Sequence, residues 1–360
     1  MQLATPLPPG STVGILGGGQ LARMLALAAG RLGLNCHIFA PEADSPAFSV
    51  AAAHTQAAYS DEDALARFAS QVDVVTYEFE NVPGLTAAFL EQRVPLAPGS
   101  RALFTAQDRV DEKTFIAGLG IPVAPFAAVA DDDSLVSAFA CIGTPSILKT
   151  RRFGYDGKGQ TAISGNRAAE AAWADIGKQP AILEGFVNFD KEISVIAARS
   201  WDGSIAVYDV PENHHEHHIL KTSTVPARIA PETAENARKI GGTIIAALDY
   251  VGVIGIEMFV AGDDVIVNEI APRVHNSGHW TMDACAVSQF EQHIRAVCGW
   301  PLGSPTRHSD VVMTNLLGDE IHDWQRLAAL PDVCLHVYGK SEARRGRKMG
   351  HFNRLTSRQA

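Results

Sequence analysis

The feature that most constrains this fold is an expected β-hairpin that carries an acidic side chain in each strand. Two apolar runs, residues 256–260 and 265–270, flank the turn sequence AGDD at 261–264, a pattern typical of an antiparallel hairpin. Glu257 and Glu269 lie inside these runs, where an unpaired charge would be costly. Because carboxylates that coordinate a hard divalent cation keep their charge, the sequence predicts a magnesium site in this hairpin.

The register of the hairpin tests this prediction. A two-residue loop would place Glu257 opposite Asn268, whereas a three- or five-residue loop would place it opposite Glu269. A cation shared by both glutamates therefore requires a longer loop or a β-bulge, and we expect one of the two. The alternative is a hairpin without a metal and with one face toward water.

A polar cluster follows the second strand directly. Its members donate hydrogen bonds, and the arginine fork matches the paired oxygens of a planar anion; they are Arg273, His275, Asn276, Ser277 and His279. The run NEIAPRVHNSGHWT at 268–281 resembles the ATP-grasp ligases. Within that superfamily it is similar to the N5-carboxyaminoimidazole ribonucleotide synthetases of purine biosynthesis.

Composition excludes several classes of protein. The net charge of -10, from 30 basic and 40 acidic residues, argues against a partner that is nucleic acid or an anionic membrane. There is no apolar run of the ~18 residues that a membrane helix needs, and residues 1–10 lack the features of a signal peptide. Five scattered cysteines without a CxxC pair indicate neither a disulfide framework nor a zinc ribbon. We expect a soluble, cytoplasmic protein.

A glycine-rich turn follows the first predicted strand, residues 12–16. Its sequence GGGQLA at 17–22 has the G-x-G-x-x-A spacing in which backbone amides at a helix N-terminus bind phosphate. Glu42 and Asp44 follow the next predicted strand, residues 35–39, as a ribose-binding acid does in nicotinamide enzymes. An NAD-dependent dehydrogenase is therefore an alternative function.

The resemblance assigns the same loop to the phosphate of the ribonucleotide substrate. The residues implied are Gly18, Gly19, Gln20 and Leu21. It also places Glu78, in the motif YEFENVP at 77–83, against this substrate. By position alone Glu78 would lie in an ordinary loop at the end of a strand.

A second glycine-rich segment, GYDGKGQ, follows a β-type run that carries Lys149. A strand lysine beside such a loop is a recurring arrangement for polyphosphate, because the loop amides and the amine together neutralise charge. The G-K-[ST] order of a Walker A loop is absent. The predicted phosphate-binding residues are Lys149, Gly154, Tyr155, Asp156, Gly157, Lys158, Gly159 and Gln160.

The resemblance implies further contacts to ATP. Arg109 lies in a helix-like stretch, where a lone basic side chain would otherwise be solvated. The segment that passes adenine is Glu184, Gly185, Phe186 and Val187, and Glu192 would bind the ribose hydroxyls. His215 is a nucleotide contact, whereas the rest of the tract at 214–218 predicts a solvated turn rather than a zinc site.

The resemblance also implies the reaction: ATP, bicarbonate and 5-aminoimidazole ribonucleotide give N5-carboxyaminoimidazole ribonucleotide, ADP and phosphate. Arg273 and Asn276 would clamp bicarbonate and carboxyphosphate, and His275 would orient that group or the amine. Mg²⁺, or Mn²⁺, would bind Glu257 and Glu269, with Asn268 as an auxiliary ligand. The basic segment at 340–348 predicts a surface tail by charge pattern, but the resemblance assigns Lys340 and Arg347 to the substrate phosphate and reacting centre. Arg345 stands where relatives carry proline, which makes Arg344 a less secure assignment.

The expected fold is α/β, with alternating strands and helices in a doubly wound N-terminal domain. By resemblance it consists of a Rossmann-like domain at 1–110, an ATP-grasp domain at 111–300 with a glycine-rich lid subdomain around 118–185, and a small β-rich C-terminal domain at 301–360. We expect helices at 233–248, packed on the sheet that contains the hairpin, and at 283–298. A homodimer is a family expectation. Another ATP-grasp ligase, such as the formate-dependent phosphoribosylglycinamide transformylase or a peptide-type ligase, is a further alternative.

Overall fold

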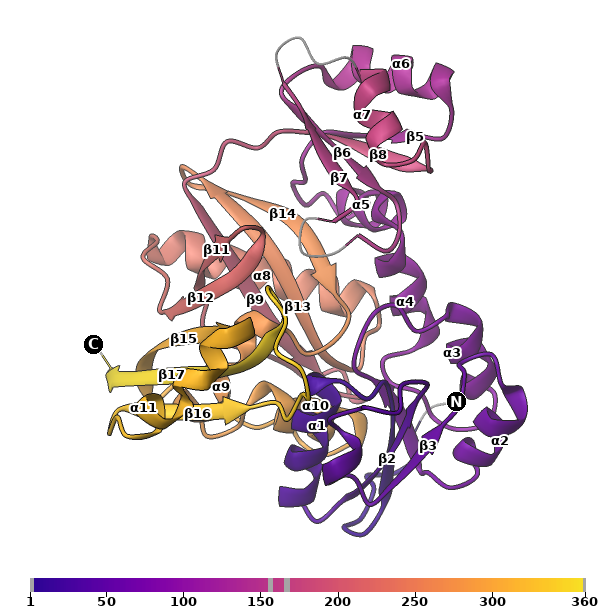
Figure 1. Ribbon diagram of the computed structural model, residues 1–360, viewed down its shortest axis with the longest axis vertical. Helices are drawn as coiled ribbons and strands as arrows, with labels where there is room; N and C mark the ends of the chain where they lie inside the picture. Colours follow the sequence, from indigo (N-terminus) through magenta and orange to yellow (C-terminus); the bar gives the residue numbers. More distant parts are fainter. Residues whose placement is uncertain (1–2, 155–157, 165–168, 359–360) are drawn as a thin grey trace.

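The computed structural model describes residues 3–154, 158–164 and 169–358. In that part of the chain the strands form one parallel sheet and two sheets whose strand pairs are antiparallel. The parallel sheet lies at the N-terminal end of the molecule and a small antiparallel sheet lies at the opposite end, with the large sheet between them (Figure 1).

The N-terminal sheet has the strand order β3-β2-β1-β4, and every pair in it is parallel. Its strands are β1 (Thr12–Leu16), β2 (Asn35–Ala40), β3 (Ala53–Gln56) and β4 (Val74–Tyr77), and the helices that connect or follow them are α1 (Gln20–Arg31), η1 (Phe48–Val50), α2 (Glu62–Ala69) and α3 (Gly84–Glu91). β1, β2 and β4 are buried almost throughout, as expected for parallel strands covered on both faces. The predicted doubly wound arrangement is confirmed.

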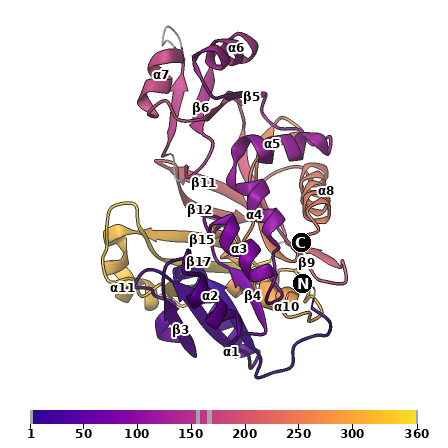
Figure 2. The same ribbon diagram turned by 90° about the vertical axis from the view of Figure 1, so that its right-hand side faces the viewer.

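A small sheet of order β5-β8-β6-β7 follows in the chain. It contains β5 (Phe126–Val129), β6 (Ser146–Thr150), β7 (Gln160–Ile163) and β8 (Ala181–Gly185), packed by α6 (Asp132–Ile142) and α7 (Ala169–Asp175). Leu135, Leu148 and Trp173 belong to its own hydrophobic core. Two helices, α4 (Ser100–Gln107) and α5 (Arg109–Gly118), connect it to the N-terminal sheet (Figure 2).

The large sheet has the order β14-β13-β9-β11-β12-β15-β17-β16, with β10 beside β9. Its strands are β9 (Lys191–Arg199), β10 (Ile205–Val207), β11 (Glu212–Glu216), β12 (Ile219–Val225), β13 (Gly252–Ala261), β14 (Asp264–Ala271), β15 (Ser309–Leu317), β16 (Val333–Val337) and β17 (Lys348–Ser357). Because β12 pairs with β15, the C-terminal strands extend the sheet that contains the hairpin.

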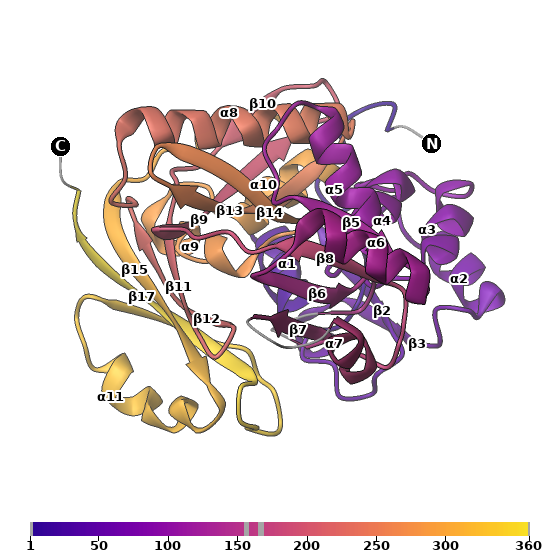
Figure 3. The same ribbon diagram turned by 90° about the horizontal axis from the view of Figure 1, so that it is seen from above.

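Helix α8 (Pro231–Ala247) lies across β9 and β13, as predicted for residues 233–248 (Figure 3). Its buried stripe includes Ile240 and Ile244, which share a core with Val195 and Ile256 of the sheet. Gly241 allows this approach, because a Cβ there would lie 2.6 Å from Val195 Cγ1. The helix thereby supports the strand that carries Glu257.

One prediction about the C-terminal third was wrong. The helix expected at 283–298 is two helices, α9 (Thr281–Ala284) and α10 (Gln289–Val297), because Ser288 is extended and its hydroxyl caps the backbone N–H of Glu291. The basic segment at 340–348 leads into β17, which pairs with both β15 and β16. The polar residues Asn353 and His351 are buried in this strand. The strand therefore lacks the apolar pattern by which a buried strand is predicted from sequence.

The remaining short helices are η2 (Asn276–Gly278), η3 (Gly318–Asp323) and α11 (Trp324–Ala328). Within the described ranges, every helix is too short or too polar to cross a membrane.

Candidate active site

The hairpin of β13 and β14 closes with a two-residue loop and contains a β-bulge. Glu257 pairs with Glu269 while Met258 pairs with Val267, so Asn268 is the extra residue. We expected either a longer loop or a β-bulge, and the bulge is present. It offsets the register that the short loop would otherwise impose. It brings three oxygen-bearing side chains to one place on the sheet.

The two glutamates of the hairpin differ in their charge environment. Burial and the charge of Glu269 raise the pKa of Glu257 to about 7. Burial also disfavours ionised Glu269, but Arg109 Nη1 lies 2.9 Å from its Oε2 and the pKa of Glu269 is lowered. Two facing carboxylates with one counter-cation are a donor set that suits a hard divalent ion. The described residues contain no cluster of three or more metal-binding His, Cys, Asp or Glu side chains.

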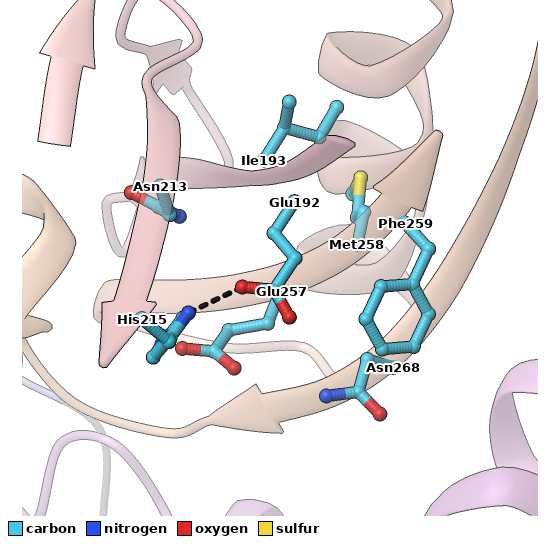
Figure 4. Close-up of a pocket in the computed structure, with 8 residues that line it drawn as sticks. All are labelled: Glu192, Ile193, Asn213, His215, Glu257, Met258, Phe259 and Asn268. Atoms are coloured by element: carbon cyan, nitrogen blue, oxygen red, sulfur yellow. Dashed lines mark hydrogen bonds and ion pairs between the residues drawn. The ribbon is translucent and has the colours of Figure 1, made fainter. Parts of the chain in front are cut away.

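A cavity beside the hairpin contains several predicted nucleotide contacts (Figure 4). It is lined by Glu192, Ile193, Asn213, His215, Glu257, Met258, Phe259 and Asn268. The His215 ring bonds to the Glu192 carboxylate through Nδ1. Burial lowers the pKa of His215, but that hydrogen bond and the charge of Glu257 outweigh it, so the pKa is raised. The tract around His215 otherwise forms β11 and its tight turn into β12, at His217 and His218.

Two lysines converge on Glu184, which lies on β8. Lys149 Nζ is 2.8 Å from Glu184 Oε2, and Lys113 Nζ is 3.7 Å from Oε1. Sequence reasoning left Lys113 without a role, although it lies four residues after Arg109, on the same face of α5. The side chains of Arg109 and Lys113 are buried or nearly so. The alternative, in which these two helical basic residues are solvated, is therefore wrong. Next along the chain, Gly185 and Val187 are partly buried and Phe186 is exposed.

The ends of the second glycine-rich segment lie beside the same cations. The carbonyl of Gly154 accepts a hydrogen bond of 3.1 Å from Arg109 Nη2, and Gln160 pairs with Lys149 across β6 and β7. Gly159 has φ +70°, and a Cβ there would lie 2.7 Å from Thr150 Oγ1. Lys158 is exposed, and the predicted contacts Tyr155, Asp156 and Gly157 lie outside the described residues.

Glu78 caps the helix that was predicted to bind phosphate. Its carboxylate accepts hydrogen bonds from the backbone N–H groups of Gly19 and Ala22 at the start of α1, the second at 2.8 Å. Burial raises its pKa, although these amides and the nearby cations Arg273 and Lys340 oppose the shift. Gln20 and Leu21 contribute the adjoining amides of the first turn.

Arg273 is held by Glu80, a residue that sequence reasoning quoted but did not assign. Its guanidinium bonds to both carboxylate oxygens, through Nε to Oε2 and through Nη2 to Oε1 at 3.1 Å. The pair joins the N-terminal segment to the large sheet. The available signal was a second carboxylate two residues after Glu78 in the same loop.

His275 connects the polar cluster that follows β14 with the hairpin. Its Nε2 lies 3.4 Å from Glu257 Oε1, and its Nδ1 lies 2.8 Å from Ser277 Oγ. Burial and the charges of Arg273 and Lys348 lower the pKa of His275 well below its usual value. Asn276 is buried, and its side-chain amide has no hydrogen-bond partner among the described residues.

Lys340 faces the capped end of α1 from the C-terminal strands. Its Nζ donates to the carbonyl of Lys348 at 2.7 Å, and burial together with Arg347 lowers the pKa of Lys340 to about 8. Ser341, the next residue, bonds to Asp44 of the N-terminal segment. Arg347 Nη1 bonds to the Glu342 carbonyl at 2.7 Å.

Three family models match successive parts of the chain. A ribonucleotide synthetase preATP-grasp domain matches residues 11–107, an ATP-grasp domain matches residues 114–290, and a phosphoribosylaminoimidazole carboxylase C-terminal domain matches residues 311–360. The second match contains the small sheet and strands β9 to β14 of the large sheet, and the third contains β16 and β17 of the same large sheet.

Several relatives that match this chain over nearly its full length carry the same name. The chain is 52% identical over 357 residues to an N5-carboxyaminoimidazole ribonucleotide synthase of Brucella melitensis, covering 98% of this chain and 99% of that one. Identity to the Pseudomonas aeruginosa protein of the same name is 44%, over 94% and 93% of the two chains. A crystal structure of an N5-carboxyaminoimidazole ribonucleotide synthetase in complex with ADP has a TM-score of 0.95 at 42% identity, covering 99% and 95% of the chains.

Proposed function

Because the chain belongs to the family of N5-carboxyaminoimidazole ribonucleotide synthases, it is an ATP-dependent ligase of purine biosynthesis, and we propose a role for each part of its site. The reaction carboxylates 5-aminoimidazole ribonucleotide with bicarbonate. Membership of this family excludes the two alternative functions, an NAD-dependent dehydrogenase and an ATP-grasp ligase with a different substrate.

The single observation that carries the residue assignment is the contact between His275 and Glu257. It joins a carboxylate pair suited to a metal and phosphate with a cluster suited to a planar anion, at 3.4 Å. Bicarbonate is a poor electrophile, so its oxygen must be phosphorylated before carboxyl transfer. Adjacent sites for phosphate and bicarbonate are what this coupling requires.

ATP lies between the small sheet and the hairpin in this proposal. Glu192 and His215 contact the ribose of ATP in the cavity, and the backbone of residues 184–187 lies beside the adenine. Lys149, Arg109 and the segment from Gly154 to Gln160 hold the phosphates. Lys113 keeps Glu184 charged and in place, because the two buried groups form an ion pair.

Glu257 and Glu269 would hold Mg²⁺, or Mn²⁺, with Asn268 of the bulge as an auxiliary ligand. The bound cation would neutralise phosphate charge. Arg109 limits the repulsion between the two carboxylates by pairing with Glu269. These residues fit the ion because they supply hard oxygen donors on a rigid pair of strands.

Arg273 and Asn276 bind bicarbonate and hold the carboxyphosphate that forms from it. The Asn276 amide, which has no partner among the described residues, offers two N–H donors and an acceptor oxygen at this point. Glu80 orients the Arg273 guanidinium through hydrogen bonds to its Nε and Nη2. His275 donates a hydrogen bond to the same group, and the buried setting excludes water from the mixed anhydride.

The ribonucleotide phosphate lies between the first turn of α1 and the C-terminal basic segment. Gln20 and Leu21 contribute backbone amides, and Lys340 and Arg347 contribute positive charge. Glu78 lies at the same turn and faces this substrate. We also propose domain boundaries near residues 110 and 300, a homodimer that light scattering would detect, and a cytoplasmic location.

The test of the function is ADP release by the purified protein with Mg²⁺, omitting bicarbonate or 5-aminoimidazole ribonucleotide in turn. We expect turnover only when the ribonucleotide is present, with the carboxylated product detected by mass spectrometry. Formate with phosphoribosylglycinamide serves as the control acceptor. Turnover with that acceptor alone would overturn the proposed substrate.

A further inference from the structure

Four buried polar side chains form a continuous hydrogen-bonded path to His275, which we call the serine relay. Its members are Ser223 on β12, Asn213 on β11, Ser194 on β9 and Ser277 in η2. The successive separations are 2.7 Å from Ser223 Oγ to Asn213 Oδ1, 3.0 Å from Asn213 Nδ2 to Ser194 Oγ, and 2.6 Å from Ser194 Oγ to Ser277 Oγ. The three serines are 0% exposed.

The direction of the relay follows from its proton count. Each hydroxyl has one proton, and a buried proton without an acceptor is costly. Among the described residues, Asn213 is the only hydrogen-bond partner of the Ser223 side chain. Ser223 therefore donates to the amide oxygen of Asn213, and this orients the amide so that its nitrogen donates to Ser194.

Ser194 must then donate to Ser277. Its oxygen already accepts from Asn213, and Ser277 Oγ is its remaining hydrogen-bond partner within the described part of the chain. Ser277 accepts that proton and directs its own proton to His275 Nδ1, 2.8 Å away. The backbone N–H of Ser277 points to the same ring nitrogen at 3.4 Å. Any arrangement with a proton on Nδ1 leaves one buried hydroxyl proton in the relay without an acceptor.

We propose that the serine relay holds His275 in the tautomer with its proton on Nε2, which makes Ser277, Ser194 and Asn213 positioning residues of this ligase. Two donors occupy Nδ1, so the ring presents a single N–H to the site, and Glu257 Oε1 is 3.4 Å from it. His275 therefore donates a hydrogen bond to a substrate or carboxylate oxygen and does not take the amine proton. This inference rests on the proposed role of His275 in binding the bicarbonate-derived group.

The direct test is ¹⁵N NMR of the full-length protein labelled at histidine, with His275→Gln identifying the signal. We expect Nε2 to be protonated and Nδ1 to be bare in the wild type. Protonation at Nδ1, or at both nitrogens, would overturn the relay. If His275→Gln keeps full activity, the proposed role of His275 fails, whichever tautomer the NMR shows.

Two variants test the relay itself. Asn213→Asp supplies two acceptors, so Ser194 would donate to it, Ser277 would donate to Ser194, and the His275 proton would move to Nδ1. Ser277→Ala removes the donor to Nδ1 and should lower kcat about tenfold, with a twofold or smaller change in KM for ATP. An unchanged tautomer in folded Asn213→Asp, or unchanged kcat in Ser277→Ala, contradicts the proposal. If Asn213→Asp does not fold, the wild-type spectrum and Ser277→Ala decide.

The matched control is Ser309→Ala. Ser309 Oγ also lies beside a histidine Nδ1, that of His308, at 3.0 Å on the surface. Loss of this bond should leave kcat within twofold of wild type. An equal loss of kcat in both alanine variants would contradict a specific role for the relay.

Discussion

At the scale of single residues, three of the cations proposed to bind anions are already paired with carboxylates. Arg109 pairs with Glu269, Lys149 with Glu184, and Arg273 with Glu80. These pairs hold long side chains in one geometry. A bound phosphate or bicarbonate would therefore contact cationic side chains that are already oriented. Each of these side chains would also remain bonded to its protein carboxylate.

The two hairpin glutamates should respond differently to removal of charge. Glu257→Gln and Glu269→Gln should each lower bicarbonate-dependent ATP cleavage about 100-fold or more, since each removes a proposed metal ligand. Glu269→Gln should also lower the free energy of unfolding by about 1–2 kcal/mol, because Arg109 loses its charged partner and that pair is partly exposed. Glu257→Gln should not destabilise the protein, because it relieves repulsion. Steady-state kinetics and urea unfolding without metal would measure both, and full activity in either variant would contradict the metal assignment.

Lys340 should impose an upper pH limit on substrate capture. Burial lowers its pKa to about 8, so the side chain is charged below that pH and becomes neutral as the pH rises through it. The quantity kcat/KM for the ribonucleotide, which reports the free enzyme, should fall above about pH 8. In Lys340→Arg the guanidinium stays charged and the fall should disappear. A wild-type profile that stays flat to pH 9.5 would contradict a phosphate-binding role.

At the scale of elements, the glycines at the N-terminus of α1 allow the Glu78 side chain to approach the backbone closely. A Cβ on Gly17 would lie 2.4 Å from Glu78 Cγ, and one on Gly19 would lie 2.6 Å from Glu78 Oε1. The glycines thus allow Glu78 to reach amides that a side chain would otherwise cover. The same turn keeps the next amides available for a phosphate.

Gly19→Ala should displace Glu78 and disturb the proposed substrate site. We expect a loss of about 1–3 kcal/mol in unfolding free energy, as for other overpacked sites, and a raised KM for the ribonucleotide. Gly30→Ala in the same helix is the matched control, because a Cβ there meets nothing within 4 Å. That change should stabilise the helix by up to about 1 kcal/mol and leave KM unchanged. Equal effects of the two substitutions would argue against the Glu78 cap.

At the scale of the whole molecule, side-chain hydrogen bonds join the N-terminal segment to α10 and the residues after it, and the C-terminal strands are part of the large sheet. Thr76 of β4 bonds to His293 of α10 at 2.7 Å, and Trp300 Nε1 bonds to the carbonyl of Leu7 at 2.7 Å. The strands of the small sheet have a core of their own, distinct from the cores of the other sheets. Stability should therefore differ between the small sheet and the rest.

Hydrogen exchange would reveal this difference. Backbone amides of β6 should exchange about tenfold faster than those of β9, because a small separate core opens at lower free energy. Saturating ADP should slow exchange in β6, where Lys149 is proposed to contact phosphate, more than in β9. Uniform exchange in the two sheets, or no effect of ADP on β6, would contradict this division.

Much of the site could be predicted because its signals are local. Strand alternation, the glycine turns and the acids within apolar runs depend on residues near one another in the chain. The bulge at Asn268 could be predicted because two glutamates on one face require a particular register. Lys113 was missed because a basic residue on a short helix has the same local pattern whether it is solvated or buried.

By itself, then, the sequence determined the hairpin, the order of its strands and helices and the types of side chain at the site. Only the tertiary structure decided which charges pair, because Glu80 and Arg273 are 193 positions apart and no local pattern links them. The same holds for Ser194 and Ser277, separated by 83 positions. It also decided that β12 pairs with β15, since strand pairing between distant segments depends on the packing of the whole chain.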